Sequence, residues 1–449
     1  MNNYKPVIGL EIHVELSTRS KMFCGCPADW FGKEANSQVC PTCLGLPGAM
    51  PVPNKVAIEW TMKLAAALGC TINSQSKFDR KHYFYPDLPK GYQISQYDQP
   101  FGINGHFTII NQRLSGDRPI RIRRVHLEED TGKLTHEGGK TSIDFNRSGV
   151  PLVEIVTEPD FVDSEKVKIF LEELQILVRL LGISDANMEQ GSMRLEPNIS
   201  LQTVEETRGE TRDELPNYKV EVKNINSFRF AKSAIDYELI RQMEILEKGE
   251  IPKQETRGWS EAKGKTISQR SKEEAHDYRY FPEPDIPPFE FDEAYITAVT
   301  SDCKNFLLYQ YDELIKNGVS PADTYTLLKN ETKLNLVKSL IKSKKILALS
   351  LDKPMSRLAS IIINNRINLN NTPLEIEKSI IAMLLPKNTD LKAVDLAIDK
   401  VLHENNEAVT QFKKGKTNAI MFLVGQVMRD LKGDADAKVI REKLDRRLK

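Results

Sequence analysis

The sequence predicts an α+β protein with a β-rich N-terminal cradle domain carrying packed helices, followed by an all-α helical domain and a small helical tail domain. Residues 7–16 alternate apolar and polar side chains, and 100–160 hold further strand-like segments separated by glycine-containing turns. Beyond about residue 294 glycine becomes rare and apolar residues recur with helical period. We therefore expect three domains, with the boundaries 1–293, 294–400 and 401–449.

Length, charge and hydropathy narrow the functional class. The 449 residues are too many for one ordinary domain, and 63 basic residues balance 63 acidic ones. This balance argues against a strongly basic nucleic-acid coat but permits local basic patches. No apolar run reaches the roughly 18–20 residues of a membrane span, and the N-terminus lacks a signal-peptide pattern. We expect a cytoplasmic protein with no membrane contact.

The first predicted strand, residues 7–16, presents ionisable groups on one face. Side chains alternate across a strand, so Glu11, His13 and Glu15 share a face, and the even-numbered apolar residues form the reverse face. Carboxylates beside an imidazole can hold a cation. The same pattern is also typical of a sheet face exposed to water.

Four cysteines cluster after this strand. Cys24 and Cys26 are followed by Cys40 and Cys43, and two closely spaced pairs are the format of a structural zinc site. We predict a zinc-binding insertion near 24–43. The first pair has only one residue between its cysteines, and four reduced thiols in a loop are the alternative.

Helices and an aromatic segment follow. Residues 54–69 and 164–181 each combine an apolar stripe with a cap and a terminal glycine, which predicts helices. A third helix, with acidic and basic faces, is predicted over 228–248 and ends before Gly249. Residues 80–100 interleave tyrosines with basic residues between prolines, so their rings could stack on unpaired nucleotides or pack on a sheet. The proline-rich residues 276–293 read as an extended strap that closes the first domain.

A second carboxylate-rich region lies at 126–160. Glu154 stands inside an apolar run, and a buried carboxylate is costly unless a metal, a cation or several donors satisfy it. Glu128 and Glu129 end a preceding strand and face opposite ways, so at most one of the two binds directly. The preferred metal ligands are Glu11, His13, Glu129 and Glu154. One imidazole among carboxylates is more usual for Mn²⁺ or Zn²⁺ than for Mg²⁺.

Several long motifs carry a family resemblance. The segments GLEIHVEL at 9–16, HLEEDTGK at 126–133, FNRSGVPLVEIVTEPD at 145–160 and DYRYFPEPD at 277–285 resemble the B subunit of the tRNA-dependent amidotransferase. That enzyme converts Glu-tRNA(Gln) to Gln-tRNA(Gln), or Asp-tRNA(Asn) to Asn-tRNA(Asn). The likeness is dense over 6–290 and returns at 414–433.

The resemblance implies chemistry that spacing alone does not reveal, because the chain has no phosphate-binding glycine loop. It implies that ATP phosphorylates the side-chain carboxylate of the misacylated tRNA, that ammonia displaces the phosphate, and that Mg²⁺ is the metal. The expected catalytic residues are Glu11, His13, Glu128, Glu129, Glu154 and Arg147. Asn146, Arg147 and Ser148 would bind ATP, with Arg147 as a phosphate clamp. A turn arginine paired with Asp144 or Glu158 is equally compatible.

Partners also follow from the resemblance. The sequence shows no convincing Ser-Ser-Lys amidase signature and no Cys-His glutaminase arrangement. Ammonia would come from the amidase, or A, subunit of the family's complex, tied to this chain by a small C subunit. A non-catalytic tRNA-binding scaffold with structural metals, and a stand-alone metal-dependent hydrolase, are the alternatives.

The C-terminal tail is the predicted tRNA contact. A helix over 435–448 would place Ala437, Ile440 and Leu444 on an apolar stripe. Off that stripe lie basic side chains free to meet phosphate: Lys438, Arg441 and Arg446. A solvated helix face is the plain alternative.

Overall fold

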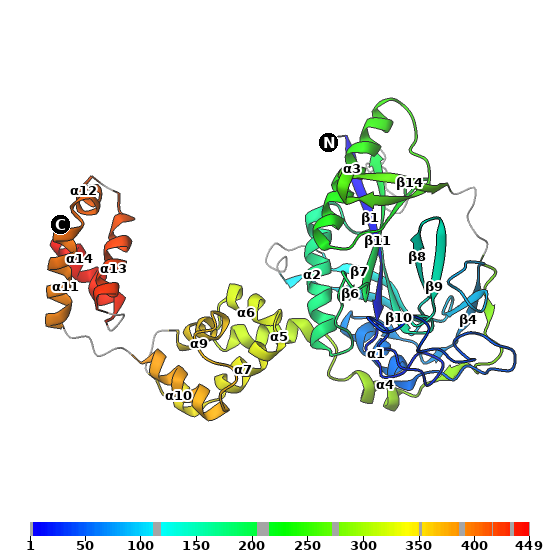
Figure 1. Cartoon of the computed structure of the whole chain (residues 1–449), viewed down its shortest axis with the longest axis horizontal. Helices are drawn as coiled ribbons and strands as arrows, with labels where there is room; N and C mark the ends of the chain where they lie inside the picture. Colours follow the sequence, from blue (N-terminus) through cyan, green and yellow to red (C-terminus); the bar gives the residue numbers. More distant parts are fainter. Residues whose placement is uncertain are drawn as a thin grey trace. The chain divides into compact units, whose positions relative to one another are not determined.

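The structure is a computed structural model that describes residues 3–110, 118–203, 215–271, 278–349, 353–385, 391–414, 416–431 and 435–448. It divides into two compact units, Met1–Glu313 and Leu314–Lys449. The first contains the sheets and the second is helical, which confirms the predicted fold class (Figure 1).

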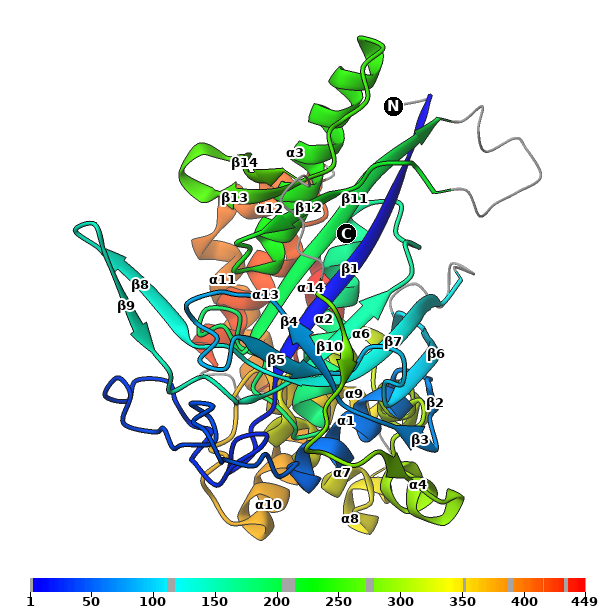
Figure 2. The same ribbon diagram turned by 90° about the vertical axis from the view of Figure 1, so that its right-hand side faces the viewer.

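A nine-stranded sheet forms the centre of the first unit, in the order β14-β13-β12-β11-β1-β10-β7-β6-β2. Neighbours run antiparallel except β12 and β13. Figure 2 shows the long strands β1 and β11 side by side. The strands are β1 (Tyr4–Glu15), β2 (Thr71–Ile72), β6 (Gly102–Phe107), β7 (Ile120–Glu129), β10 (Pro151–Thr157), β11 (Met193–Thr203), β12 (Val220–Lys223), β13 (Glu255–Ser260) and β14 (Lys265–Ser271).

One face of this sheet is apolar. In β1 the even-numbered residues from Ile8 to Val14 are at most 1% exposed, as the alternation predicted.

The helices that the sequence predicted are present, and each has a side-chain N-cap as expected for its residue type. They are α1 (Lys55–Ala67, cap Asn54), α2 (Ser164–Leu180, cap Asp163) and α3 (Phe228–Glu247, cap Ser227).

Short strands fasten the connecting segments of the first unit. A three-stranded sheet joins β15 (Phe281–Pro282), β4 (Asp79–His82) and β5 (Tyr92–Ser95), and β16 (Phe289–Glu290) pairs with β3 (Gln75–Ser76). Arg80 donates to both carboxylate oxygens of Glu283 at 2.7 and 2.8 Å, which ties the described part of the predicted strap to β4. The hairpin of β8 (Lys133–Glu137) and β9 (Lys140–Asp144) turns at Gly138 and Gly139, one of the expected glycine-containing turns.

The first unit continues past the expected boundary at residue 293. Helix α4 (Glu293–Thr300) packs on α1, and the Tyr295 hydroxyl donates to Glu59 at 3.0 Å. This contact is between residues far apart in the sequence, which explains why a change of composition did not locate it.

The second unit consists of short helices. The first group is α5 (Phe306–Lys316, which crosses the division), α6 (Pro321–Leu328), α7 (Glu331–Ile341), α8 (Lys344–Leu347), α9 (Pro354–Ile363) and α10 (Pro373–Leu384). The chain leaves helical geometry after Ile341, and Ser343 caps the new helix α8.

The tail forms its own core. It contains α11 (Leu391–Glu404), α12 (Asn406–Lys413), α13 (Ala419–Asp430) and α14 (Ala437–Leu448). Val394 and Ile398 of α11 share one buried cluster with Ile440 and Leu444 of α14. The tail therefore starts with α11, before the expected residue 401. Among the residues described in either unit, no helix is long and apolar enough to cross a bilayer.

The apolar layer of the first unit gives a stability prediction. Phe170 is fully buried, and its ring meets Phe107 of β6 at 5.5 Å and Phe161 at 5.1 Å. Phe170→Ala should lower the free energy of unfolding by about 3–5 kcal/mol, because it leaves a cavity in a packed core. Urea unfolding followed by circular dichroism measures the change. Phe84→Ala, at a position 88% exposed, is the control, and equal stability of both variants would contradict this packing.

Candidate functional site

Two imidazoles and two carboxylates meet on the polar face of the central sheet. His13 of β1 lies directly opposite Glu154 of β10, and Glu154 lies directly opposite His126 of β7. Directly opposed residues share a face, so the register of three strands places these groups in one row. Glu154 Oε2 is 3.3 Å from Nε2 of each imidazole, and Glu128 Oε1 is 3.7 Å from His13 Nε2.

The cluster is enclosed. His126 and Glu128 are 2% exposed and Glu154 is 7% exposed. Ser95 of β5 donates its hydroxyl to Glu128 at 3.0 Å, whereas His126 Nδ1 is buried with no hydrogen-bond partner among the described residues. This is a polar arrangement in a low-dielectric setting, where charges must be compensated locally.

The carboxylates control the protonation of His13. Burial by itself would lower the pKa of His13, but the hydrogen bond to Glu154 and the charges of Glu154 and Glu128 raise this pKa to about 9. Burial would raise the pKa of Glu154, but the charge and hydrogen bond of His126 and the contact with His13 hold this pKa well below its usual range. The site therefore favours a positively charged group beside the carboxylate of Glu154.

The donor set fits a divalent cation. Ligand atoms of His13, Glu128 and Glu154 all lie within 4.8 Å of one another, and His126 adjoins them. Carboxylate oxygens suit Mg²⁺, while two imidazoles favour Mn²⁺ or Zn²⁺. His126 was not among the residues expected from the sequence, although its spacing of two from Glu128 on a strand would have placed both on one face.

The structure places the other two expected metal ligands elsewhere. Glu11 lies two residues from His13 on the same face and accepts a hydrogen bond from Asn198 at 2.9 Å. Glu129 faces away from Glu128, as alternation requires, and it binds Lys90 at 2.7 Å and the backbone N–H of Ile94 at 2.9 Å. The residue of this pair that joins His13 and Glu154 is therefore Glu128, whereas Glu129 was preferred from the sequence.

The expected phosphate clamp is engaged in internal contacts. Arg147 donates to the carbonyls of Thr131 and Gly132 at 2.9 and 2.8 Å, and its guanidinium lies 5.5 Å from the Trp30 ring centre. Its acidic neighbour is Asp130 at 3.7 Å, rather than Asp144 or Glu158.

The residues beside Arg147 fasten the cysteine loop. The Asn146 side chain accepts from the backbone N–H of Gln38 and donates to the carbonyl of Glu34, and Ser148 donates to the carbonyl of Cys43. In this structure the segment 146–148 therefore joins the loop that follows β9 to the cysteine loop.

Basic and aromatic residues of the 80–100 segment stand near the cluster. The Lys81 ammonium lies 5.0 Å from the ring centre of Tyr278 and 5.8 Å from that of Tyr83. Burial alone would lower the pKa of Lys81, but the charges of Glu128 and its neighbours raise it. Tyr97 stacks on Tyr280 with ring centres 4.4 Å apart. A cation held by ring faces beside carboxylates was not foreseen from the sequence.

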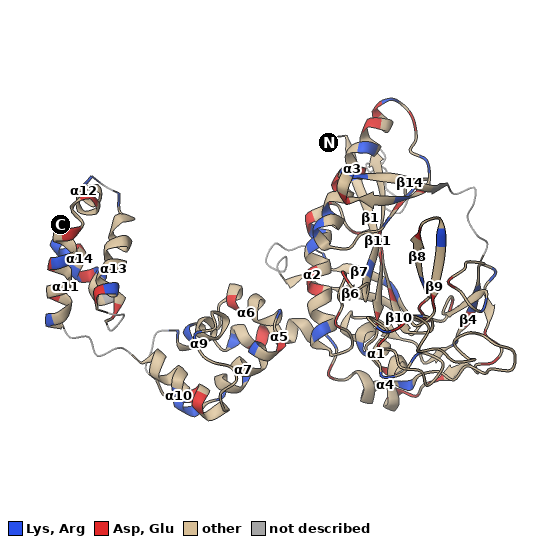
Figure 3. Cartoon of the chain, viewed as in Figure 1, with Lys and Arg blue, Asp and Glu red and all other residues tan. Residues whose placement is uncertain are grey.

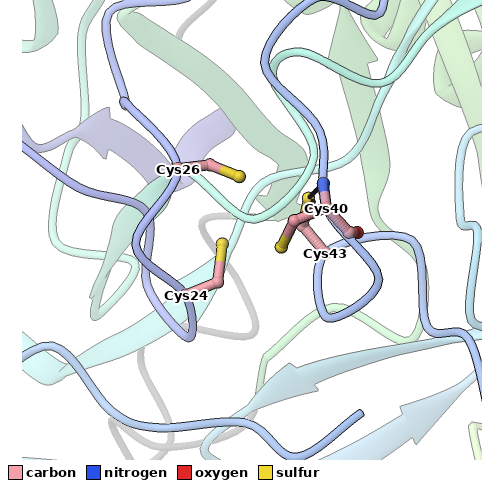
Figure 4. Close-up of side chains that lie close together, drawn as sticks. All are labelled: Cys24, Cys26, Cys40 and Cys43. Carbon is pink, nitrogen blue, oxygen red and sulfur yellow. Dashed lines mark hydrogen bonds between the residues drawn. The ribbon is translucent and has the colours of Figure 1, made fainter.

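The four cysteines converge (Figure 4). The sulfurs of Cys24, Cys26, Cys40 and Cys43 all lie within 4.8 Å of one another, and the backbone N–H of Cys40 points at Cys43 Sγ, 3.1 Å away. The hydrogen bond from Cys24 and contacts from Cys40 and Lys21 lower the pKa of Cys43. Four converging thiols with a backbone donor fit a tetrahedral Zn²⁺ site.

Figure 3 marks basic residues on the tail helix α14, and some of them are paired while others are exposed. Lys443 binds Asp395 at 2.6 Å, and Arg447 contacts Asp395 and Asp399. Arg441 and Arg446, two of the predicted tRNA contacts, are exposed. The third, Lys438, is on α14, but its side chain lies outside the described residues.

Comparisons with known proteins agree over nearly the whole chain. Residues 6–297 match the model of the GatB/GatE catalytic domain, and 312–448 match the GatB domain. The B subunit of an aspartyl/glutamyl-tRNA(Asn/Gln) amidotransferase from Thermodesulfovibrio yellowstonii is 41% identical, with 99% of each chain covered. Proteins of the same description from Thermotoga sp. and Brevibacillus brevis are 40% identical, with 97% and 98% of each chain covered.

The charge balance of the cluster gives a titration prediction for protein freed of metal by a chelator. The His13 imidazole should titrate near pH 9, and Glu154→Gln should lower this pKa towards the ordinary 6.5. Because folding raises the pKa of His13, protonated His13 adds to the free energy of unfolding. This contribution is complete below pH 6.5 and is lost as the pH rises through about 9. Histidine NMR of carbon-labelled protein measures the titration.

The matched control for this titration is Glu11→Gln. Its carboxylate is on the same face of β1 but binds Asn198, so the substitution should leave the His13 pKa close to the parent value. A parent His13 that titrates near 6.5 would contradict the described charge balance.

Proposed function

The chain belongs to the family of aspartyl/glutamyl-tRNA(Asn/Gln) amidotransferase B subunits, and we propose that it activates and amidates the misacylated tRNA. In the proposed reaction a side-chain carboxylate oxygen of Glu-tRNA(Gln) or Asp-tRNA(Asn) attacks the γ-phosphorus of ATP, and ADP leaves. Ammonia then attacks the acyl carbon, the carbon–oxygen bond to phosphate breaks, and loss of a proton gives the amide.

The observation that carries this proposal is the row of His13, Glu154, His126 and Glu128 within the region that matches the catalytic-domain model. Phosphoryl transfer depends mostly on positioning and on neutralising charge. A bound divalent cation, Mg²⁺ by family resemblance, would supply Lewis-acid neutralisation of phosphate oxygens. Because the row includes two imidazoles, Mn²⁺ is a competent substitute.

The chain's own residues contribute positioning. Glu128 and Glu154 would hold the cation, since both are buried and both face the imidazoles. Lys81, held beside them by the rings of Tyr278 and Tyr83, supplies an ammonium suited to an anionic substrate group. Arg147 is less suited to this role, because two of its donors are already bound to carbonyl oxygens and Asp130 lies 3.7 Å away.

Ammonia would reach this chain from a partner. By family resemblance, the amidase component (the A subunit) releases it from glutamine, and a small C subunit joins the two proteins. The relatives' designation as a B subunit fits an enzyme of several chains. A non-catalytic tRNA scaffold is not favoured, because a scaffold gives no reason for three buried ionisable side chains to gather beside His13.

The cysteine cluster has a separate, structural role in this proposal. Zn²⁺ bound by Cys24, Cys26, Cys40 and Cys43 would close a four-coordinate site with no open position for substrate. The tail would bind tRNA through exposed basic side chains, with Arg441 and Arg446 as the described candidates.

The amidation proposal is tested with ammonium salt, which bypasses the amidase. In the assembled complex with Glu-tRNA(Gln) and ATP, His13→Ala and Glu128→Gln should each slow Gln-tRNA(Gln) formation at least about 100-fold, as expected for lost electrostatic stabilisation. Glutamine hydrolysis by the partner amidase, measured without tRNA, is the control and should persist. Full ammonium-dependent activity of both variants would rule out the row as the reaction site.

The tail proposal predicts a change in salt dependence. Replacing both Arg441 and Arg446 with Ala should weaken tRNA binding and reduce the slope of log affinity against log salt by about 2, one for each lost phosphate contact. Filter binding at several salt concentrations measures the slope. The control Lys400→Ala removes an exposed tail lysine that binds Asp430 at 2.5 Å, and it should change the slope less. An unchanged slope in the double variant would refute the contact.

A further inference from the structure

A buried lysine stands beside the cysteine cluster. Lys21 is 1% exposed and is one of the largest fully buried side chains of the chain. A buried ammonium is costly unless an opposite charge compensates it. None of the ion pairs found across the described ranges involves Lys21, so its compensation does not come from a carboxylate there.

The partners of Lys21 show where compensation is available. Its ammonium donates to the carbonyl of Gln38 at 2.8 Å, to the carbonyl of Phe145 at 3.3 Å and to Cys43 Sγ at 3.7 Å. An ammonium has three donors, so these contacts use all of them. The two carbonyls satisfy hydrogen bonds but carry no net charge. Of these three partners, Cys43 can carry a full negative charge, as a thiolate.

We propose that Lys21 is the resident counter-ion of a tetrathiolate metal site and sets how tightly that site holds its metal. The inference rests on the proposed zinc site. A zinc ion bound by four thiolates leaves a double negative charge in a shielded loop, and one ammonium against Cys43 Sγ cancels half of it. Lys21 is a positioning residue, because it acts on the metal through a ligand sulfur.

The same ammonium also connects the cysteine loop to the loop that follows β9. Gln38 lies between the two cysteine pairs, and Phe145 precedes the Asn146–Ser148 segment. Gly149 lies beside both side chains: a Cβ built there would be 3.5 Å from Cys43 Cβ and 3.6 Å from Lys21 Cδ, and its φ of +85° is one that favours glycine. A metal whose ligand charge is balanced by Lys21 would therefore hold the cysteine loop and the loop after β9 in place together.

The test separates the charge of Lys21 from its shape and its hydrogen bonds. Lys21→Met keeps the length and removes the charge, Lys21→Gln keeps a donor without charge, and Lys21→Arg keeps the charge. The matched control is Lys33→Met, an exposed lysine of the same loop that binds Asp29 at 3.0 Å. Full-length chains are purified without chelator under reducing conditions, and zinc per chain is measured by elemental analysis.

Two readouts follow, neither of which is enzyme activity. Zinc affinity is measured by competition with a chromophoric chelator, and Met and Gln at position 21 should weaken it about 10- to 100-fold, the usual effect of losing a residue that supports a metal ligand. After exchange to Co²⁺, the thiolate charge-transfer band should move to longer wavelength in these two variants, because sulfur electrons lose a stabilising positive charge. Lys21→Arg and Lys33→Met should stay within a few-fold of the parent.

Each outcome supports or overturns the counter-ion role. Parent-like affinity and spectrum in Lys21→Met and Lys21→Gln would overturn it while leaving the zinc site intact. A loss as large in Lys21→Arg as in the neutral variants would also overturn it, since shape rather than charge would then matter. If Lys21→Met fails to fold, Lys21→Gln carries the comparison. Absence of zinc from the parent chain would overturn both the zinc site and the inference, but not the amidation proposal.

Discussion

The register among β1, β10 and β7 is the constraint on which the rest of the site depends. It places His13, Glu154 and His126 opposite one another on three successive strands. A slip of one residue would turn these groups towards the helices and expose the apolar residues. Burial of the even-numbered apolar side chains of β1 therefore sets the register of the strand. These apolar side chains take no part in the chemistry, yet they determine where the ionisable side chains of the other face meet.

The end of β7 joins the two candidate metal sites. Glu128 points to the imidazoles, while its neighbour Glu129 points to Lys90 and borders a cavity of about 130 Å³ that is also lined by Lys21, Cys43 and Gly149. Because consecutive strand residues face opposite ways, one short segment is anchored on both sides of the sheet. A displacement of the cysteine loop would act on Glu129 and, through the backbone, on Glu128.

Local patterns could be predicted from the sequence, whereas contacts between distant segments could not. Alternation gave the shared face of Glu11 and His13 and the opposite directions of Glu128 and Glu129. It could not say which glutamate meets Glu154, because that depends on the pairing of β7 with β10. His126 was missed for the same reason. The partners of Arg147 are carbonyls and Asp130, and no spacing rule indicates a carbonyl acceptor. The cysteines converged as expected because their spacing is itself local.

Charge compensation differs among the three polar regions, and the difference follows from burial. In the tail, Lys443 and Arg447 lie on an exposed helix and pair with Asp395 across to α11, so each ion pair contributes little and leaves neighbouring basic residues available to a polyanion. At the cysteine loop a buried ammonium stands against sulfur. In the row on the sheet, Glu154 lies 3.3 Å from an imidazole nitrogen of His13 and of His126, and the carboxylates raise the pKa of His13. Under the proposed function, phosphoryl transfer would take place at the row, where buried carboxylates can bind a cation from solution. The proposed zinc site would instead draw its compensating charge from Lys21, a side chain of its own loop.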